Sequence, residues 1–411
     1  MFDCRHRAIL GAAVAFLAFA GRGADAAGTA LTNCRQVVEL SARPTGEASF
    51  AIRATVSFAP KGNRPEITPS ASIADGTGAL SFSSSFPGVR DLRPGDTARF
   101  DGSIVRNQYG EAIVTLSNIT DLVHGPAPTP KDASFDEIKS GRLDDRLVRA
   151  TGVVRALFDD DIDPNWQFLV LAKDSQILYV ARQIYGNRRL TARDLLGATV
   201  AVTGICQHNR HSLMRPPYRR IDRLVAPDSN GIARVRSADT NFAHAPELST
   251  LAYHLPESFP LDRRYRARGR VLAAWNGDTV LLRTAEGPVV RAHFADCALP
   301  DVGSSVEVLG FPEYNLFTLG LTSCLWRKAT PMPTPEPDVT NVTVRALLED
   351  KAGHAKANVR LHGRAIRLEG TVQSTRGEGL DRRLVLSSGG FLVPEGYTPA
   401  TAGVGGSVEL W

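Results

Sequence analysis

The sequence predicts an all-β protein made of tandem small OB-like β-barrels, three of them complete and a fourth truncated. Three observations carry this prediction. One short strand pattern occurs four times, a glycine-bounded strand pattern follows each copy, and proline-rich joints separate the copies. A chain of 411 residues is also too long for one ordinary domain. Coincidental spacing in generic all-β domains is the alternative interpretation.

The first repeated pattern is a short strand with a small residue near its centre and a valine near its end. Its copies lie at residues 52–56, 149–154, 266–271 and 367–372. The small residue at the centre is a glycine in three of the four copies.

The second pattern reads Gly-x-x-apolar-x-apolar-x-Gly, and its complete copies span residues 95–102, 197–204 and 303–310. A fourth copy starts at Gly405 and stops at Trp411, one residue before the expected glycine. Apolar residues at every second position predict half-buried strands. The closing glycine predicts a bulge or sharp bend of the kind that small barrels need.

Further strands are expected between the two patterns, at residues 167–171, 176–181, 279–283, 289–294 and 383–386. Residues 75–78 and 286–288 have the composition of hairpin turns. Five short strands with one glycine-bent member are typical of an OB-like barrel.

Short helical lead-ins and proline-rich joints organise the chain. Lead-ins are expected at residues 133–138, with a plausible N-cap, 247–251 and 344–348, and joints at residues 125–130, 226–246 and 330–337. Such joints behave as semi-rigid spacers between compact units. The predicted division is a signal peptide at 1–26 and OB-like units at 30–125, 132–226, 246–329 and 340–411, the last truncated.

The N-terminus has the layout of a secretory signal peptide. A basic start, Arg5 to Arg7, precedes an apolar run at residues 8–20, and a small-x-small cleavage site follows at residues 24–26. We therefore expect a mature chain beginning near Ala27 in the periplasm of a Gram-negative bacterium or outside the cell. A buried core helix is the alternative, and no later stretch reaches transmembrane length.

Cysteine usage supports neither a zinc site nor a redox motif, because the sequence has no Cys-x-x-Cys. Cys297 and Cys324 fall within one predicted unit. A disulfide between them in an oxidising compartment and a pair of buried free thiols are equally compatible with the sequence.

Motif screening predicts a non-enzymatic protein with no cofactor and no metal. The common nucleophile, zinc, phosphate-loop and dinucleotide motifs are absent from the sequence. The acidic run at residues 159–163 resembles the start of a calcium loop, but Pro164 and Val170 stand where that loop needs glycine and glutamate, so a solvated hairpin tip is favoured. His208 and His211 are interpreted as surface histidines.

Candidate ligand-binding residues are aromatic rings and arginines, chosen because OB barrels bind chains through stacking and basic grooves. They are Trp166, Tyr185, Arg210, Arg219 and Trp275. Phe168 and Tyr179 alternate with apolar neighbours and are expected to fill the barrel instead. Packing between units is the alternative for Trp275. A net charge of +5 is mild, so nucleic acid is not the expected partner.

The turn Asp75-Gly76-Thr77-Gly78 and the strand from Leu92 to Gly102 also match repeated elements of one protein family. Residues 35–411 resemble the extracytoplasmic sensory region of large bacterial two-component histidine kinases, which is built of tandem OB-like units. The resemblance implies sensing of an unknown ligand or partner protein. It extends to no kinase activity, because the chain has no phosphoacceptor or ATP-binding boxes.

The sequence therefore predicts an exported, non-catalytic binding protein, similar to a sensor segment that would reach the membrane only through a missing C-terminal part. The alternative is a secreted OB-type binder of oligonucleotides or oligosaccharides. Fold alone does not choose between them.

Overall fold

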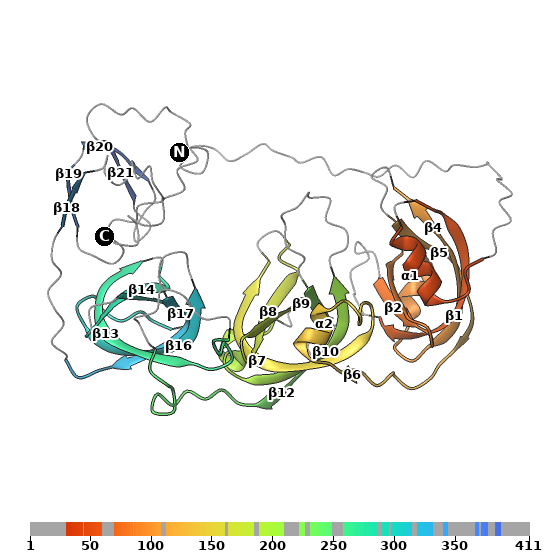
Figure 1. Ribbon diagram of the computed structural model, residues 1–411, viewed down its shortest axis with the longest axis horizontal. Helices are drawn as coiled ribbons and strands as arrows, with labels where there is room; N and C mark the ends of the chain where they lie inside the picture. The colour runs from red at the N-terminus through yellow and green to blue at the C-terminus, as the bar shows by residue number, and fades with distance from the viewer. Residues whose placement is uncertain are drawn as a thin grey trace.

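The structure is a computed structural model. It describes residues 30–43, 45–59, 70–84, 86–107, 112–160, 163–184, 189–208, 222–226, 231–248, 258–275, 277–285, 289–295, 297–314, 319–331, 340–343, 366–369, 371–376 and 383–387. Three groups of strands with a few short helices follow one another in a row, and Figure 1 labels a fourth, smaller group. We call them module 1 (residues 30–123), module 2 (131–236), module 3 (246–328) and module 4 (from residue 340).

Module 3 is a closed five-stranded barrel. Its strands are β13 (Tyr265–Trp275), β14 (Thr279–Thr284), β15 (Val289–His293), β16 (Ser305–Tyr314) and β17 (Leu319–Lys328). The first three pair antiparallel in sequence order, β15 pairs parallel with β17, and β16 closes the barrel between β17 and β13. This is the strand arrangement of an OB barrel, so the predicted fold class is confirmed.

Module 2 repeats the same arrangement with a split last strand. Its elements are β6 (Lys131–Asp132), α2 (Phe135–Lys139), β7 (Leu147–Asp159), β8 (Trp166–Lys173), β9 (Gln176–Gln183), α3 (Ala192–Leu195), β10 (Thr199–His208), β11 (Asp222–Ala226) and β12 (Ile232–Arg236). β11 pairs parallel with β9, and β10 pairs with β7 to close the barrel. β11 and β12 pair with successive parts of β10, in the place of one continuous fifth strand.

Module 1 has the same strand order in a five-stranded sheet. Its elements are α1 (Cys34–Ser41), β1 (Ala48–Phe58), β2 (Ser70–Ala74), β3 (Ala79–Ser83), the 3-10 helix η1 (Pro87–Asp91), β4 (Thr97–Arg106) and β5 (Ala112–Val123). No ladder joins β3 to β5 among the described residues, so this sheet is open where modules 2 and 3 are closed. Helix α1 was not predicted from the sequence.

Module 4 begins as the other modules do. Its described strands are β18 (Thr340–Thr343), β19 (Ile366–Glu369), β20 (Thr371–Arg376) and β21 (Arg383–Ser387). β18 runs parallel to β19, and β20 and β21 form an antiparallel pair. A parallel lead-in to the first strand is common to all modules, through Leu31 with Phe50, β6 with β7, Glu247 with Arg266, and β18 with β19.

Every first strand carries a β-bulge directly after the valine near the end of the repeated pattern. The register shifts lie between Val56 and Phe58, Val154 and Ala156, Val271 and Ala273, and Val372 and Ser374. The bulged residues are therefore Ser57, Arg155, Leu272 and Gln373. A bulge sharpens the bend and twist of a strand, which lets a short first strand belong to two sides of a barrel.

The glycine that opens the second pattern lies opposite this bulge, and its backbone is in the left-handed conformation. Gly95, Gly197 and Gly303 have φ angles of +100°, +85° and +86°. In modules 1, 2 and 3 the glycine N–H donates to the carbonyl of the bulge valine, and the valine N–H donates to the carbonyl of the residue after the glycine, at 2.7–2.9 Å. The glycine thus satisfies the backbone groups that the bulge removes from the ladder.

The closing glycine is a bulge, as predicted, in module 3, where the β16–β17 register skips Gly310. In module 1 the β4–β5 register shifts beside Gly102, but the extra residue is Ser117 of β5, and a Cβ atom at Gly102 would lie 2.1 Å from the Thr115 carbonyl oxygen. At Gly204 the reason is a close approach instead, since a Cβ atom there would lie 2.5 Å from the carbonyl oxygen of Val225.

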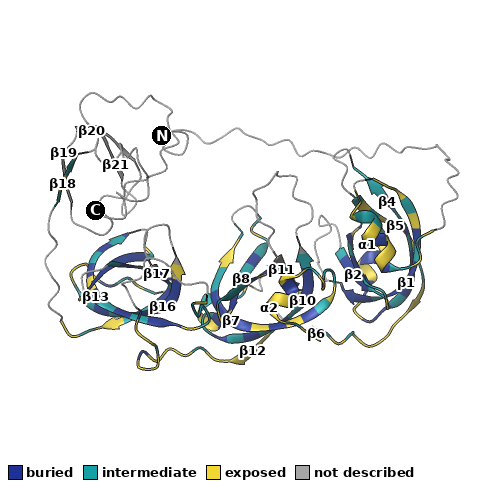
Figure 2. Cartoon of the chain, viewed as in Figure 1, coloured by how far each residue is buried: buried dark blue, intermediate teal, exposed yellow. Residues whose placement is uncertain are grey.

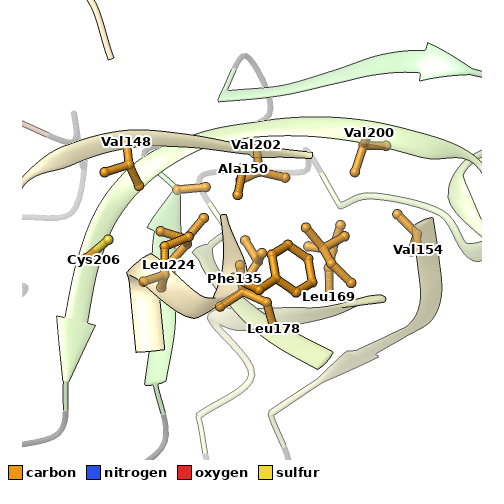
Figure 3. Close-up of a cluster of buried hydrophobic side chains, with 14 of the residues drawn as sticks. Phe135, Val148, Ala150, Val154, Leu169, Leu178, Val200, Val202, Cys206 and Leu224 are labelled. Atoms are coloured by element: carbon orange, nitrogen blue, oxygen red, sulfur yellow. The ribbon is translucent and has the colours of Figure 1, made fainter. Parts of the chain in front are cut away.

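Each module has its own apolar core inside the barrel. In module 2, Phe135 from α2 packs among strand side chains that include Val148, Leu169, Leu178 and Leu224 (Figure 3). Ser134 and Glu137 form a capping box that begins α2, which confirms the predicted N-cap. Figure 2 shows the buried residues following the strands of all three modules.

The hairpin turn predicted at residues 75–78 is also confirmed. Asp75 N–H donates to the Gly78 carbonyl at 3.0 Å, and the Asp75 carboxylate accepts the backbone N–H of Cys34 at 2.8 Å. Burial raises the pKa of Asp75, but hydrogen bonds from Thr77, Cys34 and Gly78 outweigh it, so the net pKa is lowered. This carboxylate therefore ties the turn to the start of α1.

Several sequence expectations fall outside the described residues. These are the signal peptide, most of the lead-ins at 247–251 and 344–348, the turn at 286–288 and the second pattern of module 4. Within the described part of the chain, no helix is both long enough and apolar enough to cross a membrane.

We predict that Gly310→Ala destabilises module 3 by about 2 kcal/mol, because the new Cβ would lie 2.6 Å from the Cys324 sulfur and 3.0 Å from the Thr322 carbonyl oxygen. Gly277→Ala is the matched control. Its φ of +72° costs about 1 kcal/mol, but nothing lies within 4 Å of the new atom. Urea unfolding of both variants measures the difference, and equal losses would contradict the crowding at Gly310.

Candidate functional site

Module 2 presents aromatic rings on the outside of its first strands. Phe158 of β7 is the cross-strand partner of Phe168 of β8. Their sequence neighbours Leu157 and Leu169 pack in the core of the barrel. Because side chains alternate along a strand, Phe158 and Phe168 both point outward.

The two rings form a stacked, solvent-facing pair. Their centroids are 5.7 Å apart with an interplanar angle of 19°, and Phe158 is 46% exposed. Tyr179, on the same face of β9, is 41% exposed. The expectation that Phe168 and Tyr179 fill the barrel is therefore wrong. Both faces of β8 carry apolar residues, so alternation alone did not identify the inner face.

A polar network borders the stacked pair. The side-chain amide of Gln167 donates to Asp159 at 3.2 Å, and its oxygen accepts from Arg182 at 3.2 Å. Gln167 also exchanges hydrogen bonds with the backbone of Leu190, and Arg189 forms an ion pair with Asp159. This network fixes the strand ends beneath the aromatic pair.

The acidic loop at residues 159–163 is closed by its own hydrogen bonds where the structure describes it. Asp160 accepts the backbone N–H of Asp163 at 3.3 Å, and Asp163 accepts the backbone and side-chain N–H groups of Asn165 at 3.0 and 2.7 Å. No group of three metal-ligating side chains occurs among the described residues. The geometry agrees with a hairpin tip.

Trp166 lies at the joint between modules 1 and 2. Phe58 of β1 belongs to one buried cluster with Ala181, Ile205 and Val225 on the outside of module 2. Trp166 and Phe168 pack against the same cluster. The proposed ligand residue Trp166 thus connects the exposed aromatic pair to the neighbouring module.

Three other predicted ligand residues, Tyr185, Arg210 and Arg219, lie outside the described residues. The structure therefore does not place them at the aromatic pair or elsewhere.

Trp275 is not a surface residue. It is 5% exposed and packs with Ala273 and Leu281 on the outside of module 3, where the Arg291 guanidinium lies 5.5 Å from its ring centre. The ring therefore packs within module 3, and the contacts described for it include neither a ligand-facing surface nor the packing between units that was the alternative from the sequence.

The joint between modules 2 and 3 centres on the bulged residue Arg155. Its guanidinium donates to the carbonyl of Pro312 in β16, and its own carbonyl accepts the Ser323 hydroxyl of β17 at 2.7 Å. Arg155 is 7% exposed, and burial lowers the pKa of its guanidinium, although Glu313 and Tyr179 oppose the shift. Sequence reasoning missed this residue, because only the bulge turns it toward module 3.

Two further contacts support the same joint. Arg264 of module 3 lies over the Phe311 ring at 5.3 Å and donates to the Leu196 carbonyl of module 2 at 3.4 Å. The backbone N–H of Leu261 donates to the Asp174 carbonyl at 2.6 Å. Modules 2 and 3 therefore meet through side-chain and backbone hydrogen bonds at three places.

Of the two states considered for Cys297 and Cys324, the structure has the free thiols and not the disulfide. Cys297 and Cys324 are free thiols, and the sulfur of Cys297 donates to the Cys324 carbonyl at 3.7 Å. Burial raises the pKa of Cys324, and burial with nearby carboxylates raises the pKa of Cys34 and of Cys206 to about 12.

We predict that Arg155→Met loosens the joint between modules 2 and 3. Loss of the hydrogen bond to Pro312 removes about 1–2 kcal/mol from the free energy of unfolding and separates the transitions of the two modules. Hydrogen exchange during urea unfolding, followed separately in β8 and β17, measures this. Arg263→Met, at an exposed arginine of module 3, is the control. Coincident transitions in both variants would refute the role of Arg155.

We predict that iodoacetamide leaves Cys34 and Cys206 unlabelled in the native protein at pH about 8, because raised pKa values keep both thiols protonated. After unfolding without reductant, Cys34, Cys206, Cys297 and Cys324 all become labelled. Protection of Cys297 and Cys324 until a reductant is added would show a disulfide instead.

Comparison with known proteins gives fold-level likeness at most. No family model and no curated protein matches the chain. Among solved structures, a murine DNA-binding protein bound with double-stranded DNA is 11% identical, with 47% of this chain and 100% of that one covered and a TM-score of 0.25. The tetrameric p202 HIN2 structure is 12% identical, with 44% and 91% covered and a TM-score of 0.26. Aspartyl-tRNA synthetase from Entamoeba histolytica is 9% identical, with 45% and 50% covered and a TM-score of 0.20. At these values the likeness indicates no ligand, and the OB assignment rests on the strand order itself.

Proposed function

We propose that the protein is a non-catalytic binding protein whose ligand face is the outside of the first strands of module 2. The observation that carries this proposal is the stacked pair of Phe158, which is exposed beside the loop between β7 and β8, and the half-buried Phe168. The face of the central strands and the adjoining loops is where OB barrels take up oligonucleotides and oligosaccharides. An exposed aromatic pair on that face is a ready stacking platform.

The charge around the platform favours a neutral, hydroxyl-rich ligand over a polyanion. Asp160 and Asp163 lie in the loop that follows Phe158, beside Asp159, whose carboxylate is paired with Arg189, and Asn165 adds an amide. Carboxylates repel a phosphate backbone but accept hydrogen bonds from sugar hydroxyls. Of the two chain-like ligands considered from the sequence, we therefore propose an oligosaccharide.

We further propose that binding is sensed as a change in the position of module 1 against module 2. Phe168 stacks on Phe158 and also packs against the cluster that holds Phe58 of module 1. A ligand that moves Phe168 therefore changes the packing at the joint. This role is the one that the resemblance to an exported sensor region implies. With it we propose an extracytoplasmic location and binding that needs no cofactor.

We predict that Phe158→Ala weakens oligosaccharide binding about tenfold, because one stacking surface is lost. Tryptophan fluorescence titrations of the full chain with chitohexaose and maltohexaose measure the affinity, with Trp166 close to the platform. Val235→Ala, at an exposed valine of β12 in the same module, is the matched control.

Two outcomes would count against the proposal. Binding that is equally tight in Phe158→Ala and the unsubstituted protein would place the ligand elsewhere. Binding of oligothymidine with no binding of either sugar would show that the ligand is a polyanion.

A further inference from the structure

A row of arginines lies on the outside of strand β13 in module 3. Ala267 and Val271 of this strand belong to the core of the barrel. Because side chains alternate along a strand, Arg266, Arg268 and Arg270 point outward. Arg270 is exposed, and Arg266 and Arg268 are half-buried. Successive members of the row are about 7 Å apart along the strand.

A fourth arginine extends the row across the sheet. Strands β13, β16 and β17 lie side by side (Figure 1). Glu307 of β16 is the cross-strand partner of Arg268 on one side and of Arg327 on the other. The Arg327 side chain is 54% exposed, and its guanidinium lies 4.5 Å from the centre of the Phe242 ring. We call this surface the arginine face, and its members are Arg266, Arg268, Arg270 and Arg327.

One carboxylate lies within the arginine face. Glu307 accepts a hydrogen bond from Arg327 at 2.7 Å and forms an ion pair with Arg266 at 3.7 Å. Its side chain is only 12% exposed. Within residues 305–310, the part of β16 that pairs with β13, Glu307 is the only acidic residue. A single, largely covered carboxylate does not neutralise four guanidinium groups.

The other two arginines are held by uncharged groups. Arg268 donates to the Thr330 carbonyl at 2.9 Å, and Arg270 donates to the Gly303 carbonyl at 3.2 Å. A carbonyl carries no net charge, and each of these bonds uses one of the five N–H donors of a guanidinium. Asp301, in the turn that contains Gly303, adds a second carboxylate at one end of the row. The centre of the arginine face therefore keeps a net positive charge.

The row belongs to module 3 and is not required by the fold. Counted back from the bulge valine, the same three outward positions hold one arginine in each of the other two barrels. They are Ala51, Arg53 and Thr55 in module 1, and Arg149, Thr151 and Val153 in module 2. Like charges about 7 Å apart repel one another, so three arginines in one row lower the stability of the unbound protein. A bound anion removes that repulsion.

We infer that the arginine face binds a linear acidic polysaccharide, a chain with carboxylate or sulfate groups at regular intervals. The planar guanidinium group matches the geometry of carboxylates and related oxyanions. A row along one strand presents these groups at a repeat distance, which suits an extended chain better than a single small anion. This inference goes beyond the proposed function and is independent of the aromatic pair on module 2.

Two other polyanions fit the arginine face less well. Proteins that bind single-stranded nucleic acid combine a basic groove with aromatic side chains on which bases stack. Residues 266–270 and 305–310 include no aromatic residue, and Phe242 is 9% exposed beside Arg327. Membrane-surface elements add inserting apolar side chains to their basic residues, but the outward-pointing Leu309 is 1% exposed. The face offers charge without stacking or insertion.

The test measures binding of a fluorescein-labelled heparin dodecasaccharide to the full chain by fluorescence anisotropy, at about 50 mM and about 200 mM salt. We expect the double variant Arg268→Ser/Arg270→Ser to bind at least tenfold more weakly at the lower salt concentration, with a shallower dependence on salt. Arg263→Ser, at an exposed arginine of the same module outside the row, is the matched control and is expected to change the affinity less than about twofold.

Hydrogen exchange in β16 checks that the barrel is intact in each variant. If the double variant loses this protection, Arg270→Ser alone replaces it, with an expected loss of about threefold. Equal binding by the substituted and unsubstituted proteins, with β16 protected, would overturn the inference.

Three further outcomes would also count against an acidic polysaccharide. The first is no binding of heparin by the unsubstituted protein at the lower salt concentration. Oligothymidine bound more tightly than heparin would identify a nucleic acid as the partner. Binding to vesicles that contain phosphatidylglycerol, without binding of heparin, would identify a membrane surface.

Discussion

Each barrel depends on a pair of backbone hydrogen bonds between the bulge valine and a left-handed glycine turn. Val56, Val154 and Val271 are the valines, and they exchange N–H and carbonyl groups with the turn at Gly95, Gly197 and Gly303. Without these bonds the bulge would leave two buried backbone groups unpaired. Only a glycine adopts this φ without strain, so the turn, the bend of strand one and barrel closure all depend on one residue type at one position.

The same bulge determines how modules join. The extra residue in strand one points away from the barrel at Arg155, and the residue after it does so at Phe58. The next module packs against that outward-pointing side chain. The identity of that residue then sets the chemistry of the joint, which is apolar at Phe58 and hydrogen-bonded at Arg155. Because the fold places these residues but does not constrain their type, each joint can differ in strength while the architecture stays the same.

The repeated patterns were sufficient to predict the first and fourth strands, the OB-like class and the bulge at Gly310, because period-two alternation and glycine act locally. The fifth strands β5, β11 and β17 carry no such pattern and were not predicted. The sites were harder to predict. Phe168 was assigned to the wrong face, since β8 is apolar on both sides, and Arg155 was missed, since an arginine in a strand gives no sign that it is the bulged residue. The order of strands that brings Phe58 onto Ile205 is a tertiary property that no local pattern contains.

In the proposed function, the position of the aromatic pair couples ligand binding to the joint between modules 1 and 2. A ligand shifts a conformational equilibrium only to the extent that it binds one arrangement better than the other. Phe168 supplies that difference in the proposed function, because it contacts both Phe158 and the cluster around Phe58. A ring that stacks on a ligand takes up one orientation, and only some placements of module 1 pack well against that orientation. In the proposed function, sensing requires no hinge of its own, because the surface proposed to bind the ligand and the surface that holds module 1 share the side chain of Phe168.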